Sequence, residues 1–187
     1  MVLLLSAEQQ AQIAAHGEKA YPYEGCGVLL GTVKTVEGGQ GTGKGGAIAE
    51  ASSEVTVTVM EVHAVKNGWI TESNDQFDVV PGAQETAERR FTIDPRDLLR
   101  LQRDGRDRGF DIIGIYHSHP NHPAVPSDFD RTYAWAHYSY PIVAVHQGKA
   151  VDLRSWRLDK SGQFQPELIQ PTPIQSVPSF SSVPPNE

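Results

Sequence analysis

Residues 116–130, YHSHPNHPAVPSDFD, gather three histidines, two aspartates and two serines into one short stretch. Imidazole nitrogens and carboxylate oxygens are ligands that catalytic zinc accepts. His117 and His119 are two positions apart, so a strand places both rings on one face, with Cα atoms about 7 Å apart. Ser127 and Asp130 are three positions apart and share one face of a helix's first turn. If the intervening loop turns this face toward the strand, three ligands meet around one point.

Such a site has a definite chemistry. Three protein ligands leave a fourth zinc position for water, whose pKa then falls to about 7. A hydrolytic site also needs a carboxylate that is not a ligand, because the water's proton must be moved. Ser127 is placed to donate a hydrogen bond to a developing oxyanion.

Simpler interpretations of these residues stay open. A lone His-x-His pair can merely end a strand, and Ser127 with Asp130 fits an ordinary helix capping box. His122 is a rival ligand, although its place in mid-loop before Pro123 favours an exposed or supporting role. Cys26 is most simply a small buried residue at the start of a strand.

The elements that must position these residues follow from apolar periodicity and helix caps. Strands are expected at residues 26–33, 54–65, 110–119, 141–148 and 150–158. Helices are expected from Ser6 to Pro22, from Asp94 to Gly109, and from Ser127 onward with Phe129, Tyr133, Ala136 and Tyr140 on one side. This order predicts a mixed α/β layered structure.

The domain organisation is simple. We expect one domain over residues 1–158, with a Gly-rich loop at 37–53 and a second insertion at 71–90 that could cover a substrate channel. Residues 159–187 are rich in Pro and Ser and are expected to form a tail without structure of its own.

The composition argues against several classes of protein. The 187 residues carry a net charge of −7, which argues against a nucleic-acid partner. A single cysteine allows neither an internal disulfide nor a cysteine-rich zinc site. No apolar run approaches the roughly 18 residues of a membrane span, and the N-terminal run is too short for a signal peptide. The expected location is therefore the cytoplasm, without a membrane partner.

The spacing His117-x-His119, then Ser127 and Asp130, resembles the JAMM signature of MPN-domain zinc metalloproteases. The segment YPYEGCGVLLG resembles the one that carries the family's catalytic glutamate in small bacterial and archaeal members, which makes Glu24 the matching residue. The resemblance covers residues 1–158 and implies a cytidine-deaminase-like layered fold, with a twisted mixed β-sheet flanked by helices. No ligand position is substituted, which implies an active enzyme.

The resemblance also implies a mechanism and a substrate class. One zinc ion would be held by His117, His119 and Asp130, Glu24 would move the proton of its water, and Ser127 would steady the oxyanion. Small members of the family act on ubiquitin-like sulfur-carrier proteins that end in Gly-Gly, cleaving the peptide or isopeptide bond after that pair. Such a tail needs a narrow channel, for which Gly25 and Gly27 could leave room.

Four other hypotheses were compared with this one. The run GGQGTGKGG lacks the Ser or Thr of a phosphate-binding loop, because Gly45 stands there. A serine hydrolase using Ser118 or Ser127 lacks the G-x-S-x-G elbow. A JAMM relative associated with DNA repair has a similar histidine run, but the acidic charge and the Glu24 segment favour the peptidase. A metal-stabilised scaffold without activity stays open.

Overall fold

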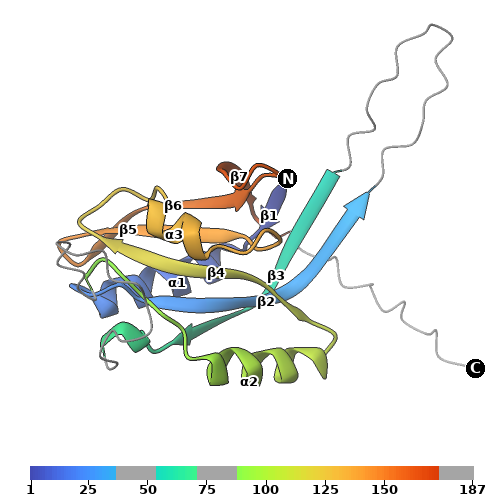
Figure 1. The fold of residues 1–187 in the computed structure, drawn as a ribbon, viewed down its shortest axis with the longest axis horizontal. Helices are drawn as coiled ribbons and strands as arrows, with labels where there is room; N and C mark the ends of the chain where they lie inside the picture. Colours follow the sequence, from blue (N-terminus) through green and yellow to red (C-terminus); the bar gives the residue numbers. More distant parts are fainter. Residues whose placement is uncertain (37–53, 71–87, 173–187) are drawn as a thin grey trace, which may run out of the picture.

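The computed structural model describes residues 1–36, 54–70 and 88–172 (Figure 1). The predicted loop at 37–53, most of the insertion at 71–90 and the end of the tail lie outside the described residues. In chain order the elements are β1 (Val2–Leu4), α1 (Ala7–Ala20), β2 (Cys26–Val36), β3 (Glu54–Val65), η1 (Gly68–Ile70), α2 (Pro95–Arg106), β4 (Asp111–Pro120), α3 (Asp128–Tyr133), β5 (Tyr140–His146), β6 (Lys149–Leu158) and β7 (Phe164–Gln170).

The strands form one mixed sheet in the order β1-β3-β2-β4-β5-β6-β7, which closes because β1 also pairs with β7. β4 runs antiparallel to β2 and parallel to β5, so it lies inside the sheet. Buried neighbours along a strand contribute to different clusters: Leu29 joins Ile13 of α1, and Leu30 joins Leu101 of α2. The two helices therefore cover opposite faces of the sheet, as the predicted mixed α/β fold with flanking helices requires.

The first helix starts at Ser6, as predicted, with a capping box. The Ser6 side chain accepts a hydrogen bond from the Gln9 amide, and the Gln9 side chain accepts one from the Ser6 amide. α1 also approaches β4 closely, because a Cβ atom at Gly17 would lie 3.0 Å from the Cβ of Ser118. This close contact fixes the back of the strand that carries the histidines.

The prediction of an unstructured tail from residue 159 is wrong for residues 164–170. These residues form β7, which pairs with β6 and β1. The Asp159 carboxylate accepts hydrogen bonds from the amides of Ser161 and Gln163, which stabilises the turn into β7. Glu167 of β7 then accepts a hydrogen bond from Ser155 of β6 in the interior.

The predicted helix after Ser127 is shorter than expected. α3 ends at Tyr133, and Ala134 is already extended. The Tyr140 hydroxyl accepts a hydrogen bond from the Trp135 amide and donates one to the Trp135 carbonyl, while Tyr140 itself begins β5. These contacts end the helix before Ala136 can join it. None of the helices in the described part of the chain is long and apolar enough to span a membrane.

Candidate metal centre

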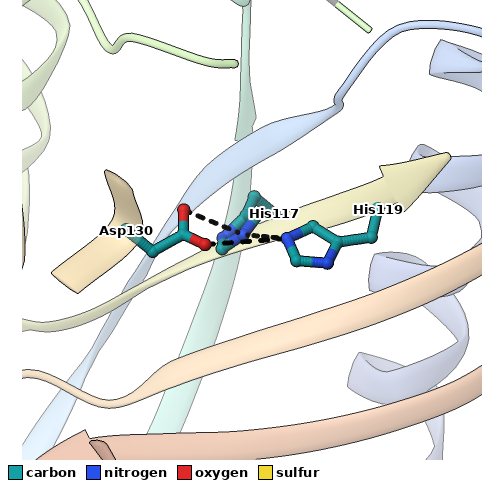
Figure 2. Close-up of side chains that lie close together, drawn as sticks. All are labelled: His117, His119 and Asp130. Carbon is teal, nitrogen blue, oxygen red and sulfur yellow. Dashed lines mark hydrogen bonds and ion pairs between the residues drawn. The ribbon is translucent and has the colours of Figure 1, made fainter. Parts of the chain in front are cut away.

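The site residues come from one face of β4 and the first turn of α3 (Figure 2). His117 and His119 project from the same face of the strand, with their Nε2 atoms 3.0 Å apart. Asp130 approaches from α3, with carboxylate oxygens 3.5 Å from Nε2 of His117 and 3.7 Å from Nε2 of His119. The predicted convergence of these three side chains is confirmed, and among the described residues they form a group that could hold a metal ion.

Ser127 fixes the orientation of Asp130. The Ser127 amide donates to Oδ2 of Asp130 at 2.6 Å, its hydroxyl donates to the same oxygen at 2.7 Å, and the Asp130 amide returns a hydrogen bond at 3.2 Å. Burial alone would raise the pKa of Asp130, but His117, His119 and these hydrogen bonds outweigh burial and hold that pKa well below its ordinary value. The carboxylate is thus ionised when it faces the histidines. The capping box that the sequence offered as an alternative is present, and it orients the ligand.

The surroundings of His119 leave it a lone pair for a cation, and those of His117 disfavour its protonated form. Nδ1 of His119 lies 2.8 Å from the Pro123 carbonyl oxygen, which can only accept, so Nδ1 carries the proton and Nε2 is left with a lone pair. Burial lowers the pKa of His117 to about 4, which keeps its ring neutral at physiological pH. The ring stacks on Phe91, with centroids 4.7 Å apart.

The donor set fits a metal ion. Two imidazoles and an ionised carboxylate meet at separations of 3.0 to 3.7 Å. A tetrahedral zinc with bonds of about 2.0 to 2.1 Å would separate its ligand atoms by roughly 3.3 Å. These three residues therefore suit a metal ion, although this geometry alone leaves its identity open.

Glu24 is buried beside the group without being part of it. Its segment is tied to β4, since the Gly25 amide donates to the Ser118 hydroxyl and the Ser118 amide donates to the Gly25 carbonyl, both at 2.8 Å. The Asn67 side chain donates to the Glu24 carbonyl at 2.9 Å. Burial raises the pKa of Glu24 well above its ordinary value, and the Asp130 charge adds to this, whereas Arg90 and Arg89 oppose it.

Two hollows adjoin the centre. A cleft of about 190 Å³ is lined by Glu24, Arg89, Arg90, His119, His122, Pro123, Val125 and Ser127. An apolar groove of about 210 Å³ lies on the Asp130 side and is lined by Phe91, Thr92, Ile93, Leu98, Ile115, Phe129, Asp130, Tyr133 and Trp135. His122 lies on the cleft wall and is absent from the candidate ligand group. The centre thus opens on one side to a polar space and on the other to an apolar one.

Several site residues were not found from the sequence. Arg89, Arg90 and Asn67 lie in or beside a segment interpreted only as an insertion, and no motif marked them. The room expected beside Gly25 and Gly27 is taken by the protein itself. A Cβ at Gly27 would lie 2.3 Å from the Tyr116 ring, and one at Gly25 would lie 2.9 Å from Ala20. These glycines admit α1 and Tyr116, and that part of the prediction is wrong.

Comparison with known proteins places this geometry in a family. A solution structure from Desulfitobacterium hafniense shares 26% identity, with a TM-score of 0.61 and coverage of 92% of this chain and 93% of that one. Another from Salinibacter ruber shares 28% identity, with a TM-score of 0.57 and coverage of 95% of each chain. A JAB1/MPN domain protein from Archaeoglobus fulgidus shares 14% identity, with a TM-score of 0.43 over 90% of this chain and 98% of that one.

No curated protein matches the chain. A family model, described as prokaryotic homologs of the JAB domain, matches residues 6–159, a range that contains every residue of the candidate metal centre. The chain therefore belongs to the prokaryotic JAB-domain family.

Proposed function

We propose that this protein is a zinc-dependent peptidase that hydrolyses the peptide or isopeptide bond after the C-terminal Gly-Gly of a ubiquitin-like sulfur-carrier protein. One observation supports a peptidase more strongly than any other. A buried carboxylate, Glu24, lies beside the His117, His119 and Asp130 group without belonging to it, and both adjoin one cleft. A purely structural metal site has no need of a spare buried carboxylate at its open side.

His117, His119 and Asp130 would hold the ion, which when bound acidifies a water molecule and polarises the scissile carbonyl. The protein prepares the ligands in advance. Pro123 fixes the proton of His119 on Nδ1, and Ser127 holds the carboxylate of Asp130. These supporting hydrogen bonds keep the donor atoms oriented before any ion arrives.

Glu24 is the proton carrier. Its carboxylate accepts the proton that the attacking water loses and then delivers it to the leaving amine as the C–N bond breaks. The products are a carrier with a free Gly-Gly carboxylate and an amine, with one water consumed. The raised pKa of Glu24 in the metal-free protein suits this use, because a carboxylate with a raised pKa is a stronger base and takes up the proton of water more readily. A bound cation would pull this pKa down again by its charge.

Ser127 has two roles in this proposal. In the resting site its hydroxyl donates to Oδ2 of Asp130. Because Ser127 also lines the cleft, its hydroxyl can turn from Asp130 toward the oxyanion that forms when the carbonyl is attacked. The Ser127 amide keeps its own hydrogen bond to Asp130 during that turn, so the carboxylate stays oriented.

The sulfur-carrier substrate is supported by the resemblance of the motif and by the shape of the site. The apolar groove runs between the segment with Phe91 and Ile93 and the aromatic side chains of α3. It can receive the extended residues that precede a Gly-Gly end, while the glycines themselves pass the crowded centre. Arg90 closes one side of this passage, since its guanidinium lies 4.2 Å from the Phe129 ring centroid.

The test is mass spectrometry of a ubiquitin-like sulfur carrier that has one residue or a short peptide after its Gly-Gly. We expect release by the wild-type protein, loss of release with a chelator, and recovery when zinc is returned. Glu24→Gln keeps the shape of the side chain and is expected to retain zinc while losing at least about 100-fold in kcat.

Three results would contradict the proposal. Cleavage by Glu24→Gln at the wild-type rate would remove Glu24 from the proton transfer. Bound zinc, measured by elemental analysis, without cleavage of any Gly-Gly substrate would favour a metal-stabilised scaffold instead. Release that persists in chelator and fails after Ser127→Ala would favour serine chemistry.

A further inference from the structure

Asn67, in the turn between β3 and η1, joins two segments that border the metal centre. It is buried, with 5% of its surface exposed. Its side-chain nitrogen donates to the Glu24 carbonyl at 2.9 Å and to the Arg90 carbonyl at 3.0 Å. Its side-chain oxygen accepts from the Trp69 amide at 3.0 Å and from the Thr92 amide at 3.3 Å. One amide thus connects the Glu24 segment with residues 90–92.

The hydrogen-bonding capacity of this amide is fully used. A carboxamide has two N–H donors and an oxygen with two lone pairs. Both donors meet carbonyl oxygens, and both lone pairs meet backbone N–H groups. If the amide turned over, its nitrogen would face N–H groups and its oxygen would face carbonyls, so only one orientation satisfies all four neighbours. Moving either segment would leave buried polar groups without partners, and the amide therefore holds both in place.

The bond to Glu24 completes the attachment of the proposed proton carrier. On the β4 side, Gly25 and Ser118 exchange hydrogen bonds at 2.8 Å. On the β3 side, Asn67 binds the Glu24 carbonyl itself. A group that moves a proton must stay within hydrogen-bond reach of the water that it activates. The loss of one of these two attachments would therefore displace the carboxylate from its working position.

The bonds to Arg90 and Thr92 fix Phe91, which lies between them in the chain. Asn67 binds the carbonyl before Phe91 and the amide after it. The Gly68 amide adds a hydrogen bond to the Thr92 carbonyl at 2.9 Å. The backbone on both sides of Phe91 is thus attached to the turn that contains Asn67, which sets where the aromatic ring lies.

The Phe91 ring in turn orients a metal ligand. It stacks on the ring of His117, with centroids 4.7 Å apart and planes at 26°. His119 has a hydrogen bond from Nδ1 to the Pro123 carbonyl, but Nδ1 of His117 is buried and has no hydrogen-bond partner among the residues that the structure describes. Ligand histidines are usually oriented by a hydrogen bond at the second nitrogen. At His117 the stack on Phe91 takes that role.

We propose that Asn67 is a positioning residue that sets both Glu24 and, through Phe91, the ring of His117. It belongs neither to the candidate ligand group nor to the lining of either hollow, so its effect on the centre passes through these neighbours. The part that concerns Glu24 rests on the proposed function. The part that concerns His117 requires only a metal ion and is tested without substrate.

The first measurement is zinc affinity, by competition with a chromophoric chelator. Phe91→Leu removes the stack, and Asn67→Ala removes the bonds that hold it, so we expect each variant to bind zinc about 10-fold more weakly. Leu98→Ala is the matched control. Leu98 lines the same groove and packs with the same apolar cluster as Phe91, but it has no ring to stack on His117. It should keep the wild-type zinc affinity, and wild-type affinity in Phe91→Leu would overturn the effect on His117.

The second measurement is the rate of carrier cleavage at saturating zinc. Asn67→Ala should lower kcat about 10- to 100-fold with little change in KM, because Glu24 loses its fixed position. Glu24→Gln should then cost less in the Asn67→Ala background than in the wild-type protein, since a displaced carboxylate contributes less to the rate. If Asn67→Ala does not fold, Asn67→Asp takes its place, because it keeps the size and the acceptor oxygen but lacks the amide donors.

Ser155→Ala is the control for a general loss of stability. Ser155 is also buried and donates to Glu167 at 2.8 Å, but it lines neither hollow. Its midpoint of unfolding in urea should fall, as that of Asn67→Ala does, while zinc affinity and kcat stay near the wild-type values. Equal losses of zinc affinity and kcat in Ser155→Ala and Asn67→Ala would overturn the inference.

Two further outcomes separate this inference from the proposed function. If Glu24→Gln costs the same factor with and without Asn67, then Asn67 does not act through Glu24, and the peptidase stands. If the wild-type protein cleaves no carrier, the proposed function fails. The zinc affinities of Phe91→Leu and Asn67→Ala then still decide whether Asn67 positions the metal centre.

Discussion

The two faces of β4 differ in how their buried polar atoms are satisfied. On one face the Tyr116 hydroxyl lies 3.0 Å from Nδ1 of His16, and Ser118 exchanges hydrogen bonds with Gly25. On the other face the Nε2 atoms of His117 and His119 point at each other and at Asp130. One face is completed by hydrogen bonds to other elements of the protein, whereas the other gathers three side chains that could hold a metal ion.

Along β4, the residues that hold the strand in place therefore lie on one face, and the residues of the candidate metal centre lie on the other. Buried polar groups are costly unless they find partners. The face toward α1 meets that requirement with protein atoms and so fixes the strand. The face toward α3 instead gathers polar side chains that could hold a metal ion beside the cleft. The predictions below test this division, from the largest expected effect to the smallest.

Removal of a ligand should have the largest effect. Asp130→Ala leaves two imidazoles without their carboxylate, and we expect zinc affinity to fall more than about 100-fold, with loss of cleavage. Zinc content after dialysis and the rate of release measure both effects. Asp128→Ala is the matched control, because this neighbouring carboxylate is 97% exposed. Zinc binding by Asp130→Ala at wild-type affinity would show that the face of β4 toward α3 does not form the metal centre with Asp130.

Acid should destabilise the metal-free site through His117. Its pKa is about 4 in the folded protein and 6.5 ordinarily, so below pH 6.5 the unfolded chain binds a proton that the folded one refuses. The free energy of unfolding should therefore fall by about 3 kcal/mol between pH 6.5 and pH 4, with no further loss from this group below that.

The contribution of Glu24 to the free energy of unfolding changes with pH in the opposite direction, so this carboxyl must be removed before the measurement. Its raised pKa favours the folded state at low pH, and that contribution is lost as pH rises above its ordinary 4.5. The measurement therefore uses metal-free Glu24→Gln protein in urea at each pH. Adding His117→Gln should flatten the slope. An unchanged slope would mean that His117 does not resist protonation in the fold.

Ser118→Ala should affect both stability and catalysis. It leaves the buried Gly25 amide without an acceptor, at a cost of about 1 to 3 kcal/mol. The neighbouring Glu24 then loses its fixed position, so kcat should fall about 10-fold while zinc content is retained. Urea unfolding, elemental analysis and release kinetics separate the three effects.

Tyr116→Phe is the control for that variant. It lies on the same face and loses the hydrogen bond to His16, at a cost of about 1 kcal/mol. The hydrogen bond that is lost does not involve Glu24 or Gly25, so kcat should stay near the wild-type value. If both variants lowered kcat alike, the effect of Ser118 would come from general loosening of the strand and not from the position of Glu24.

Sequence patterns were sufficient where the cause is local. Alternation along a strand places His117 and His119 together, and a Ser-x-x-Asp capping box places Asp130 on the first turn of α3. Both follow from backbone geometry between near neighbours. Glu24 was found by resemblance alone, because nothing in its own segment distinguishes a catalytic carboxylate from an ordinary turn residue.

The features that only the tertiary structure decided depend on contacts between segments that are distant in the sequence. β1 was missed because it has only three residues, and β7 because it contains Pro166 and adjoins a Pro-rich stretch. Val2 nevertheless pairs with Leu168 to close the sheet. α3 ends early because Tyr140, from the next strand, bonds to Trp135. Arg89 meets Glu24 only through the fold. The sequence by itself determined the chemistry of the ligands, whose spacing is short-range. The folded chain decided how the sheet closes, where α3 ends and which residues line the cleft beside Glu24. Each of these depends on contacts that no local pattern encodes.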